Sequence, residues 1–62
     1  MTDRELEVLT AVARGDRNKE IAWQLGITER TVKAHLVNIN NKLGVDSRAA
    51  AVSAAMQRGL LG

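Results

Sequence analysis

The fold is decided by the stretch "GITERTVKAHLVNINNKLG", Gly26–Gly44, whose apolar residues recur at intervals of four, three and four. At roughly 100° of rotation per residue, this spacing places them on one narrow stripe of an α-helix. The residues of the stripe are Val32, Leu36, Ile39 and Leu43. The stretch therefore predicts a helix that packs one face against a core.

The opposite face of the same helix mixes small and apolar residues with polar ones. Ala34 and Val37 lie in its middle, although a face that met only water would need neither. Their neighbours on this face are Arg30, Lys33, Asn38 and Asn41. The mixture indicates a surface that contacts a partner.

Capping signals outside this stretch predict an all-α fold of four helices. Thr2 and Glu5 have the spacing of a capping box, Asn18 is expected to cap a second helix, and Thr28 caps the long one. Either Asp46 or Ser47 is expected to cap the last helix. The expected helices span about residues 3–14, 18–25, 29–43 and 47–58 and form one bundle-like domain over residues 1–62.

The other three helices are expected to contribute their own apolar stripes to the core. We predict the inward residues Leu6, Leu9, Val12 and Ala13 in the first helix, Ile21, Ala22 and Leu25 in the second, and Val52, Ala55 and Met56 in the last. A chain of 62 residues buries only about 60% of its unfolded surface, so a marginally stable single domain follows.

The amino-acid composition indicates the cellular compartment of the protein. The chain has no cysteine, which excludes disulfides and thiolate metal sites and favours the reducing cytoplasm. No apolar run approaches the roughly 20 residues of a membrane span, and the N-terminus lacks a signal-peptide pattern. We expect a cytoplasmic protein with no membrane contact.

Charge is unevenly distributed although the net charge is only +2. Residues 1–13 hold one basic and three acidic side chains, whereas residues 14–48 hold seven basic and four acidic ones. A negatively charged partner would therefore be attracted to the middle of the chain.

The short helix, the turn and the long helix have the spacing of a helix-turn-helix. Ala22 permits close helix approach, Gly26 permits a left-handed turn, and Val32 joins the second helix to the first. In such a unit the second helix presents its outer face to the major groove of double-stranded DNA. Arg30 and Lys33 are then suited to guanine or phosphate, and Ala34 and Val37 to thymine methyl groups.

The sequence resembles the LuxR/GerE-type helix-turn-helix family, which includes output domains of NarL- and FixJ-like response regulators. The segments that carry the resemblance are "TDRELEVL", "GDRNKEIA", "TVKAHLVNINNKLGV", "SRAAAV" and "RGLL". The resemblance implies a four-helix DNA-binding domain that regulates transcription in two-component signalling. It also implies base reading chiefly through Lys33, Ala34 and Val37.

Residues and resemblance together give the expected DNA contacts. Base-reading residues are Arg30, Lys33, Ala34 and Val37, and phosphate-binding residues are Arg17, Lys19, Thr28, Thr31, His35, Asn38 and Asn41.

Two departures from the family pattern matter. Arg17 replaces the small hydroxyl residue that commonly caps the second helix, and it adds a candidate phosphate contact. Met1 stands where relatives are already inside a longer chain, so we expect their receiver or ligand-binding domain to be absent.

The last helix is expected to turn Ala50, Ser53, Ala54 and Gln57 outward. Helix propensity alone would explain alanines there, but the resemblance implies a dimer contact. We predict a weak homodimer on paired half-sites.

Glu5 falls at the edge of the buried stripe of the first helix and needs a partner. We predict a structural contact between Glu5 and Arg48, at the core edge of the last helix.

Alternative functions are weaker. Trp23 lies opposite the inward residues of its helix and is expected to be an exposed, partly covered surface residue. It could also contact a DNA phosphate or another protein such as RNA polymerase. A protein-interaction module built on the same scaffold is therefore the main alternative. An enzyme is not expected, because His35 is the only histidine and no nucleophile, metal-ligand set, cofactor site or small-molecule site accompanies it.

Overall fold

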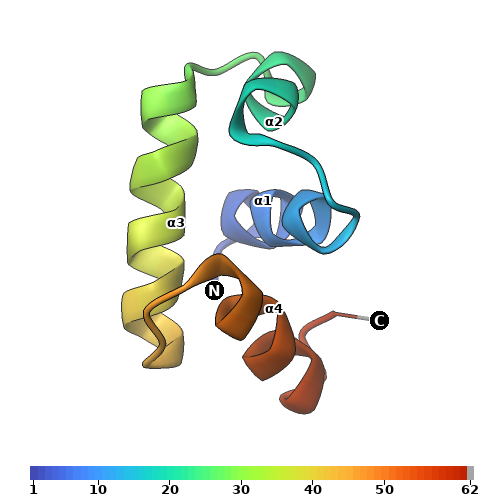
Figure 1. The fold of residues 1–62 in the computed structure, drawn as a ribbon, viewed down its shortest axis with the longest axis vertical. Coiled ribbons are helices and arrows are strands. Elements are labelled where there is room, and N and C mark those ends of the chain that lie inside the picture. Colours follow the sequence, from blue (N-terminus) through green and yellow to red (C-terminus); the bar gives the residue numbers. More distant parts are fainter. Residues whose placement is uncertain (62) are drawn as a thin grey trace.

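The computed structural model describes residues 1–61 and contains four helices in this range, with no strand. They are α1 (Asp3–Ala13), α2 (Asn18–Leu25), α3 (Glu29–Leu43) and α4 (Arg48–Gln57). Figure 1 shows α3 along one side of the molecule, with α2, α1 and α4 arranged beside it along its length. The predicted all-α fold with four helices is confirmed, and the helix bounds agree to within one residue.

Side chains fix the start of three helices as expected. Thr2 and Glu5 form the capping box, in which Glu5 Oε1 accepts a hydrogen bond of 2.9 Å from the Thr2 backbone N–H. The hydroxyl of Thr28 accepts from Thr31 N at 3.1 Å and starts α3. Of the two candidates for α4, the cap is Ser47, whose hydroxyl accepts from Ala50 N at 3.1 Å.

The predicted cap of α2 is wrong. Asn18 is the first helical residue, and Arg17 occupies the extended cap position before it. Glu20 satisfies this helix start instead, because its Oε1 accepts a 2.8 Å hydrogen bond from Arg17 N. The side chain of Asn18 is turned to another partner, the guanidinium of Arg48.

Glycines end α2 and α3 in the left-handed conformation that L side chains rarely adopt. Gly26 has φ 67° and Gly44 has φ 70°. A Cβ at Gly26 would meet no atom within 4 Å, so its conformation, and not lack of space, makes glycine the preferred residue.

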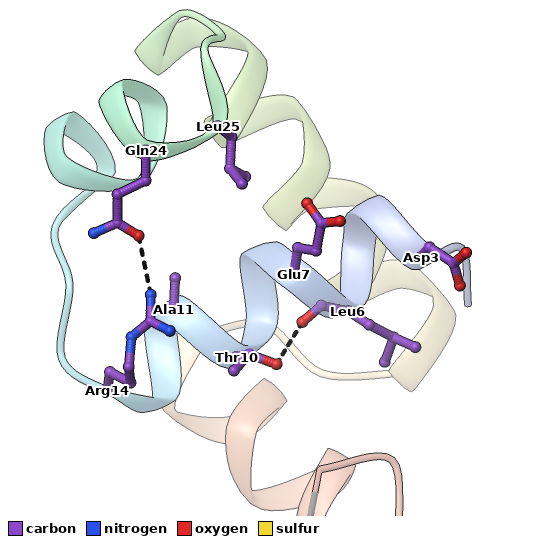
Figure 2. A pocket seen from close by; sticks show the side chains of 8 residues that line it. All are labelled: Asp3, Leu6, Glu7, Thr10, Ala11, Arg14, Gln24 and Leu25. Carbon is purple, nitrogen blue, oxygen red and sulfur yellow. Dashed lines mark hydrogen bonds between the residues drawn. The ribbon is translucent and has the colours of Figure 1, made fainter.

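A groove of about 620 Å³ lies between α1 and α2. Leu6, Ala11 and Leu25 give it an apolar lining, and a hydrogen bond of 3.0 Å from Arg14 to Gln24 crosses one end (Figure 2). Within residues 1–61, no group of three or more His, Cys, Asp or Glu side chains is arranged to hold a metal ion.

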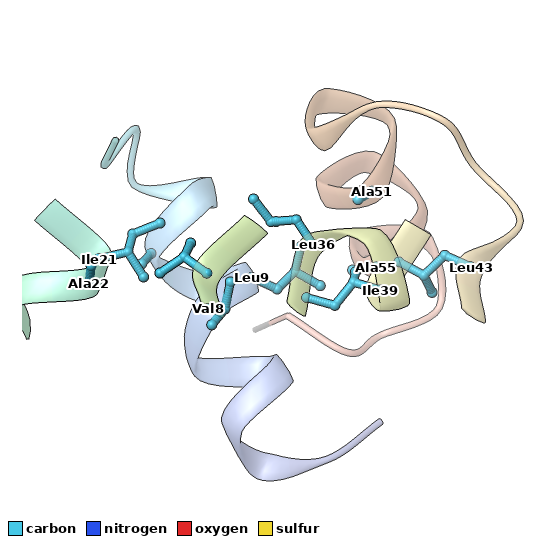
Figure 3. Close-up of a cluster of buried hydrophobic side chains, with 11 residues drawn as sticks. Val8, Leu9, Ile21, Ala22, Leu36, Ile39, Leu43, Ala51 and Ala55 are labelled. Atoms are coloured by element: carbon cyan, nitrogen blue, oxygen red, sulfur yellow. The ribbon is translucent and has the colours of Figure 1, made fainter. Parts of the chain in front are cut away.

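The core is one cluster of buried aliphatic side chains to which all four helices contribute. Figure 3 shows it extending from α2, past α1 and α3, to α4. The four residues of the α3 stripe are all buried, as predicted. The largest fully buried side chains are Val8, Leu9, Ile21, Val32 and Ile39.

Three predicted core positions lie outside the core. Leu6 is half-buried and lines the groove between α1 and α2. Ala13 is exposed, whereas Val8 in the same helix is fully buried. In α4, Met56 is 59% exposed, and the fully buried residues are Ala51 and Ala55. Alanines at the contact let α4 approach α3 closely, so the bulkier methionine is left outside.

Candidate nucleic-acid interface

The helix-turn-helix consists of α2, the turn at residues 26–28 and α3. Ile27 N donates a 3.0 Å hydrogen bond to Ala22 O across the turn. Ala22 is 6% exposed and Val32 is fully buried, so the two helices are held through small and apolar contacts. The predicted structural roles of Ala22 and Gly26 agree with this geometry.

The outer face of α3 is accessible along most of its length. Arg30, Lys33 and Ala34 are exposed, and Val37 retains 51% of its surface exposed. Exposed Asn38 and Asn41 continue this face toward the end of the helix. An accessible alanine and valine beside two cations make a surface with both apolar and charged groups.

Two of the predicted phosphate-binding residues, Thr31 and His35, lie at the flank of α3 and are half-buried. The hydroxyls of Thr28 and Thr31 lie 2.9 Å apart, and Thr28 also caps the helix. These hydroxyls therefore already hold the start of α3, whatever else they contact.

The cations of this surface are not neutralised by the domain itself. Within residues 1–61 the salt bridges involve Arg4, Arg14 and Lys42, and none involves the predicted DNA-contacting cations Arg17, Lys19, Arg30 or Lys33. All four are exposed. A surface with several unpaired cations attracts a polyanion.

The predicted contact between Glu5 and Arg48 is wrong. Glu5 is 4% exposed and pairs with Lys42, whose Nζ lies 2.6 Å from Glu5 Oε1. Hydrogen bonds from Lys42 and from the Thr2 backbone, opposed by desolvation, lower the pKa of Glu5 to about 2. The last turn of α3 lies next to the start of α1, which the sequence pattern did not reveal.

Arg48 has a different structural role. Its Nη1 donates to Asn18 Oδ1 at 2.9 Å, and its Nη2 donates to the backbone carbonyl of Asp16 at 3.1 Å. The Asp16 carboxylate accepts from Arg14 at 2.9 Å and from Gln24 at 3.3 Å. The bond from Arg14 holds the pKa of Asp16 below its usual value.

The predicted dimer face on α4 is only partly accessible. Ser53 and Gln57 are exposed, whereas Ala50 and Ala54 are half-buried, and Ala54 packs against the core. The large apolar side chain that α4 exposes is Met56, which is 59% exposed.

Trp23 is 85% exposed on α2, as predicted. A shallow hollow beside it is lined by Lys19, Glu20, Trp23 and Gln24.

Among the helices described, none is long and apolar enough to cross a membrane.

Comparison with known proteins agrees with this geometry. Residues 1–55 match the family model of bacterial regulatory proteins of the luxR family. The chain is 52% identical over 98% of its length to the transcriptional regulatory protein YdfI of Bacillus subtilis, and 48% identical over 94% to the nitrate/nitrite response regulator NarP of Escherichia coli. It spans 29% and 27% of these two relatives.

The solved structure of the transcription factor GerE superimposes on the whole chain with a TM-score of 0.95 and 37% identity, and the match covers 92% of the GerE chain. Sequence and structure therefore give the same assignment. The chain belongs to the luxR family of bacterial regulatory proteins, transcription regulators whose helix-turn-helix domains bind DNA.

Proposed function

We propose that this domain binds double-stranded DNA in a sequence-specific manner to regulate transcription, with α3 in the major groove. The observation that supports this most directly is the outer face of α3, where accessible Ala34 and Val37 lie among unpaired Arg30 and Lys33. An α-helix fits the major groove, and a face without bulky side chains can lie deep in it.

The base-reading residues have complementary roles. Lys33 and Arg30 donate hydrogen bonds to guanine O6 and N7, and Ala34 and Val37 contact thymine methyl groups. Since the apolar contacts recognise a group that cytosine lacks, they contribute to sequence discrimination that the cations alone do not supply.

The phosphate-binding residues fix the register of α3 on the duplex. Arg17 and Lys19 approach the backbone from the start of α2, because the first helix of a helix-turn-helix crosses the DNA backbone. Around α3 the same role falls to Thr28, Thr31, His35, Asn38 and Asn41.

We further propose that two domains occupy paired half-sites through a weak contact between α4 helices. Ser53 and Gln57 are the exposed members of this face, and Ala50 and Ala54 allow close approach at its edge. Half-sites for such dimers lie about one helical turn, roughly 10 base pairs, apart. Sedimentation showing monomers both free and on a duplex with two half-sites would contradict the dimer.

The similarity to NarP supports a role as the output domain of a two-component response regulator. In that setting a separate controlling domain would determine when the DNA-binding surface acts.

Selection of duplexes from a random pool tests the DNA proposal. The winning duplex and a scrambled control are then titrated by fluorescence anisotropy at several salt concentrations. We expect a short motif, an inverted pair in the dimer case, with affinity for both duplexes falling steeply as salt rises. A pool without enrichment and no salt-dependent binding would reject it.

A protein-interaction module is the second candidate, supported by the 85% exposure of Trp23 and the 51% exposure of Val37. RNA polymerase is one partner that such a surface on a transcription regulator would meet. Salt distinguishes the two functions, because a hydrophobic protein contact changes little with salt whereas phosphate binding weakens.

A further inference from the structure

Arg48 connects the start of α4 to the start of α2. The two helices lie on opposite sides of α1 (Figure 1), and the guanidinium spans the distance between them with two hydrogen bonds. One goes to the side chain of Asn18 at 2.9 Å and the other to the backbone of Asp16 at 3.1 Å. A single side chain thus holds both the last part of the α1–α2 loop and the first residue of α2.

The loop is also held from its own flanking helices. Arg14 and Gln24 bind the Asp16 carboxylate, and Asp16 N donates to Ala11 O at 3.1 Å. Those contacts come from α1 and α2 themselves, whereas Arg48 comes from α4. Arg48 therefore adds a link from α4 to the start of α2, beside the contacts that come from the ends of α1 and α2.

The residues on either side of Asn18 are the proposed phosphate contacts of α2. Arg17 and Lys19 are exposed, and neither side chain forms a salt bridge within residues 1–61. Both side chains extend from the backbone around Asn18, and Arg48 binds this segment through the Asn18 side chain and the Asp16 carbonyl.

We propose that Arg48 is a positioning residue for the DNA-backbone contacts at the start of α2. This inference rests on the proposed function. The planar fork of arginine binds two acceptors at fixed separation, which a lysine ammonium on a flexible stem does not reproduce. Because α4 also carries the proposed dimer face, the same link joins the dimer helix to the DNA surface.

The experiment compares Arg48→Lys, Arg48→Met and Asn18→Ala with wild type, using the selected duplex and the scrambled control over a range of salt. Circular dichroism first shows that each variant is folded at the binding temperature. We expect both Arg48 variants to lose about one phosphate contact, which lowers the salt slope by about 0.9 and affinity on the order of fivefold at physiological salt.

Three readouts distinguish positioning from other roles. The affinity ratio between selected and scrambled duplexes stays the same, because α3 is not altered. Arg48→Lys behaves like Arg48→Met although it keeps the charge. The double variant Arg48→Lys/Asn18→Ala loses less affinity than the product of the single losses, because both changes break the same link.

Arg4→Met is the matched control, since it removes one positive charge from an exposed pair with Glu7 on α1. We expect its affinity to equal that of wild type. Arg48→Lys binding like wild type while Arg48→Met does not would overturn the proposal in favour of a direct charge contact, as would losses that simply multiply. A wild type that binds neither duplex would instead overturn the proposed function, and this role with it.

Discussion

The inner and outer faces of α3 share one backbone but obey different constraints. On the inner face Val32 and Ile39 are completely buried, and each is surrounded by the other helices. On the outer face Val37 is 51% exposed and lies outside the core cluster. Apolar residues on the inner face follow from packing, whereas those on the outer face need a partner to explain them.

Two lysines on this helix show the same contrast for charge. Lys42 contacts the buried carboxylate of Glu5 at 2.6 Å, but Lys33 has no salt-bridge partner among residues 1–61. Residue type alone does not separate these roles. We infer that Lys42 serves folding and that Lys33 is available to a ligand, and four experiments test this division.

Ile39→Ala should have the largest effect, because it leaves a cavity in the centre of a small core. We expect it to lower the free energy of unfolding by about 2–5 kcal/mol, which is enough to unfold much of a domain of this size. Urea denaturation followed by circular dichroism measures the change. Val37→Ala is the matched control on the outer face, and a comparable loss there would remove the distinction between the faces.

Lys42→Met should come next. It removes one partner from a buried carboxylate that retains hydrogen bonds from Thr2, so we expect a loss of stability of about 2 kcal/mol. We expect the folded variant to bind DNA with an affinity close to that of wild type. Fluorescence anisotropy measures this under conditions in which the variant is fully folded. Undiminished stability would show that the pair contributes nothing to folding.

Lys33→Ala should show the reverse behaviour. Stability should change by no more than about 0.5 kcal/mol, since the side chain is exposed and unpaired. Binding to the selected duplex should weaken by about 1–2 kcal/mol if Lys33 forms a good base contact, with a smaller loss on scrambled DNA. Equal losses on both duplexes would make Lys33 a phosphate contact.

The pH dependence of stability gives the most specific test of the pair between Glu5 and Lys42. The pKa of Glu5 is about 2 in the folded protein, below the 4.5 of an unperturbed carboxyl, so its contribution is complete above about pH 4.5. That contribution is lost as pH falls through about 2. The stability difference between wild type and Glu5→Gln should shrink over this window, and a constant difference would contradict the ion pair.

The sequence predicted the features that depend on local chemistry. Caps at Thr2 and Thr28 and left-handed glycines at positions 26 and 44 set the helix bounds, and the regular spacing on α3 set its buried face. These signals lie within one helix or its flanking turns, so no knowledge of the other helices was required.

The wrong predictions concern residues whose burial or partner depends on contacts between helices. Glu5 and Val8 lie on the buried face of α1, whereas the predicted stripe includes the exposed Ala13 and omits Val8. Lys42, the partner of Glu5, is 37 residues away, so no local pattern connects them. In α4, a run of alanines gave no clear face, and the close contact through Ala51 could not be told from the sequence.

The DNA-contacting residues of α3 stay a prediction, which rests on apolar residues that a face in contact only with water does not need. Ala34 and Val37 are two such residues, and both are exposed in the structure. The roles of Arg48 and Asn18 were missed, since a hydrogen bond between the first residues of two helices leaves no periodic trace.

Trp23 also provides an intrinsic fluorescence probe for this protein. It is the only aromatic residue among Phe, Trp and Tyr in the chain, and it is 85% exposed on α2. Its emission therefore reports the surroundings of one surface of α2 and is nearly insensitive to the packing of the aliphatic core. A blue shift on addition of DNA or of a protein partner would identify which ligand covers α2, without any attached label.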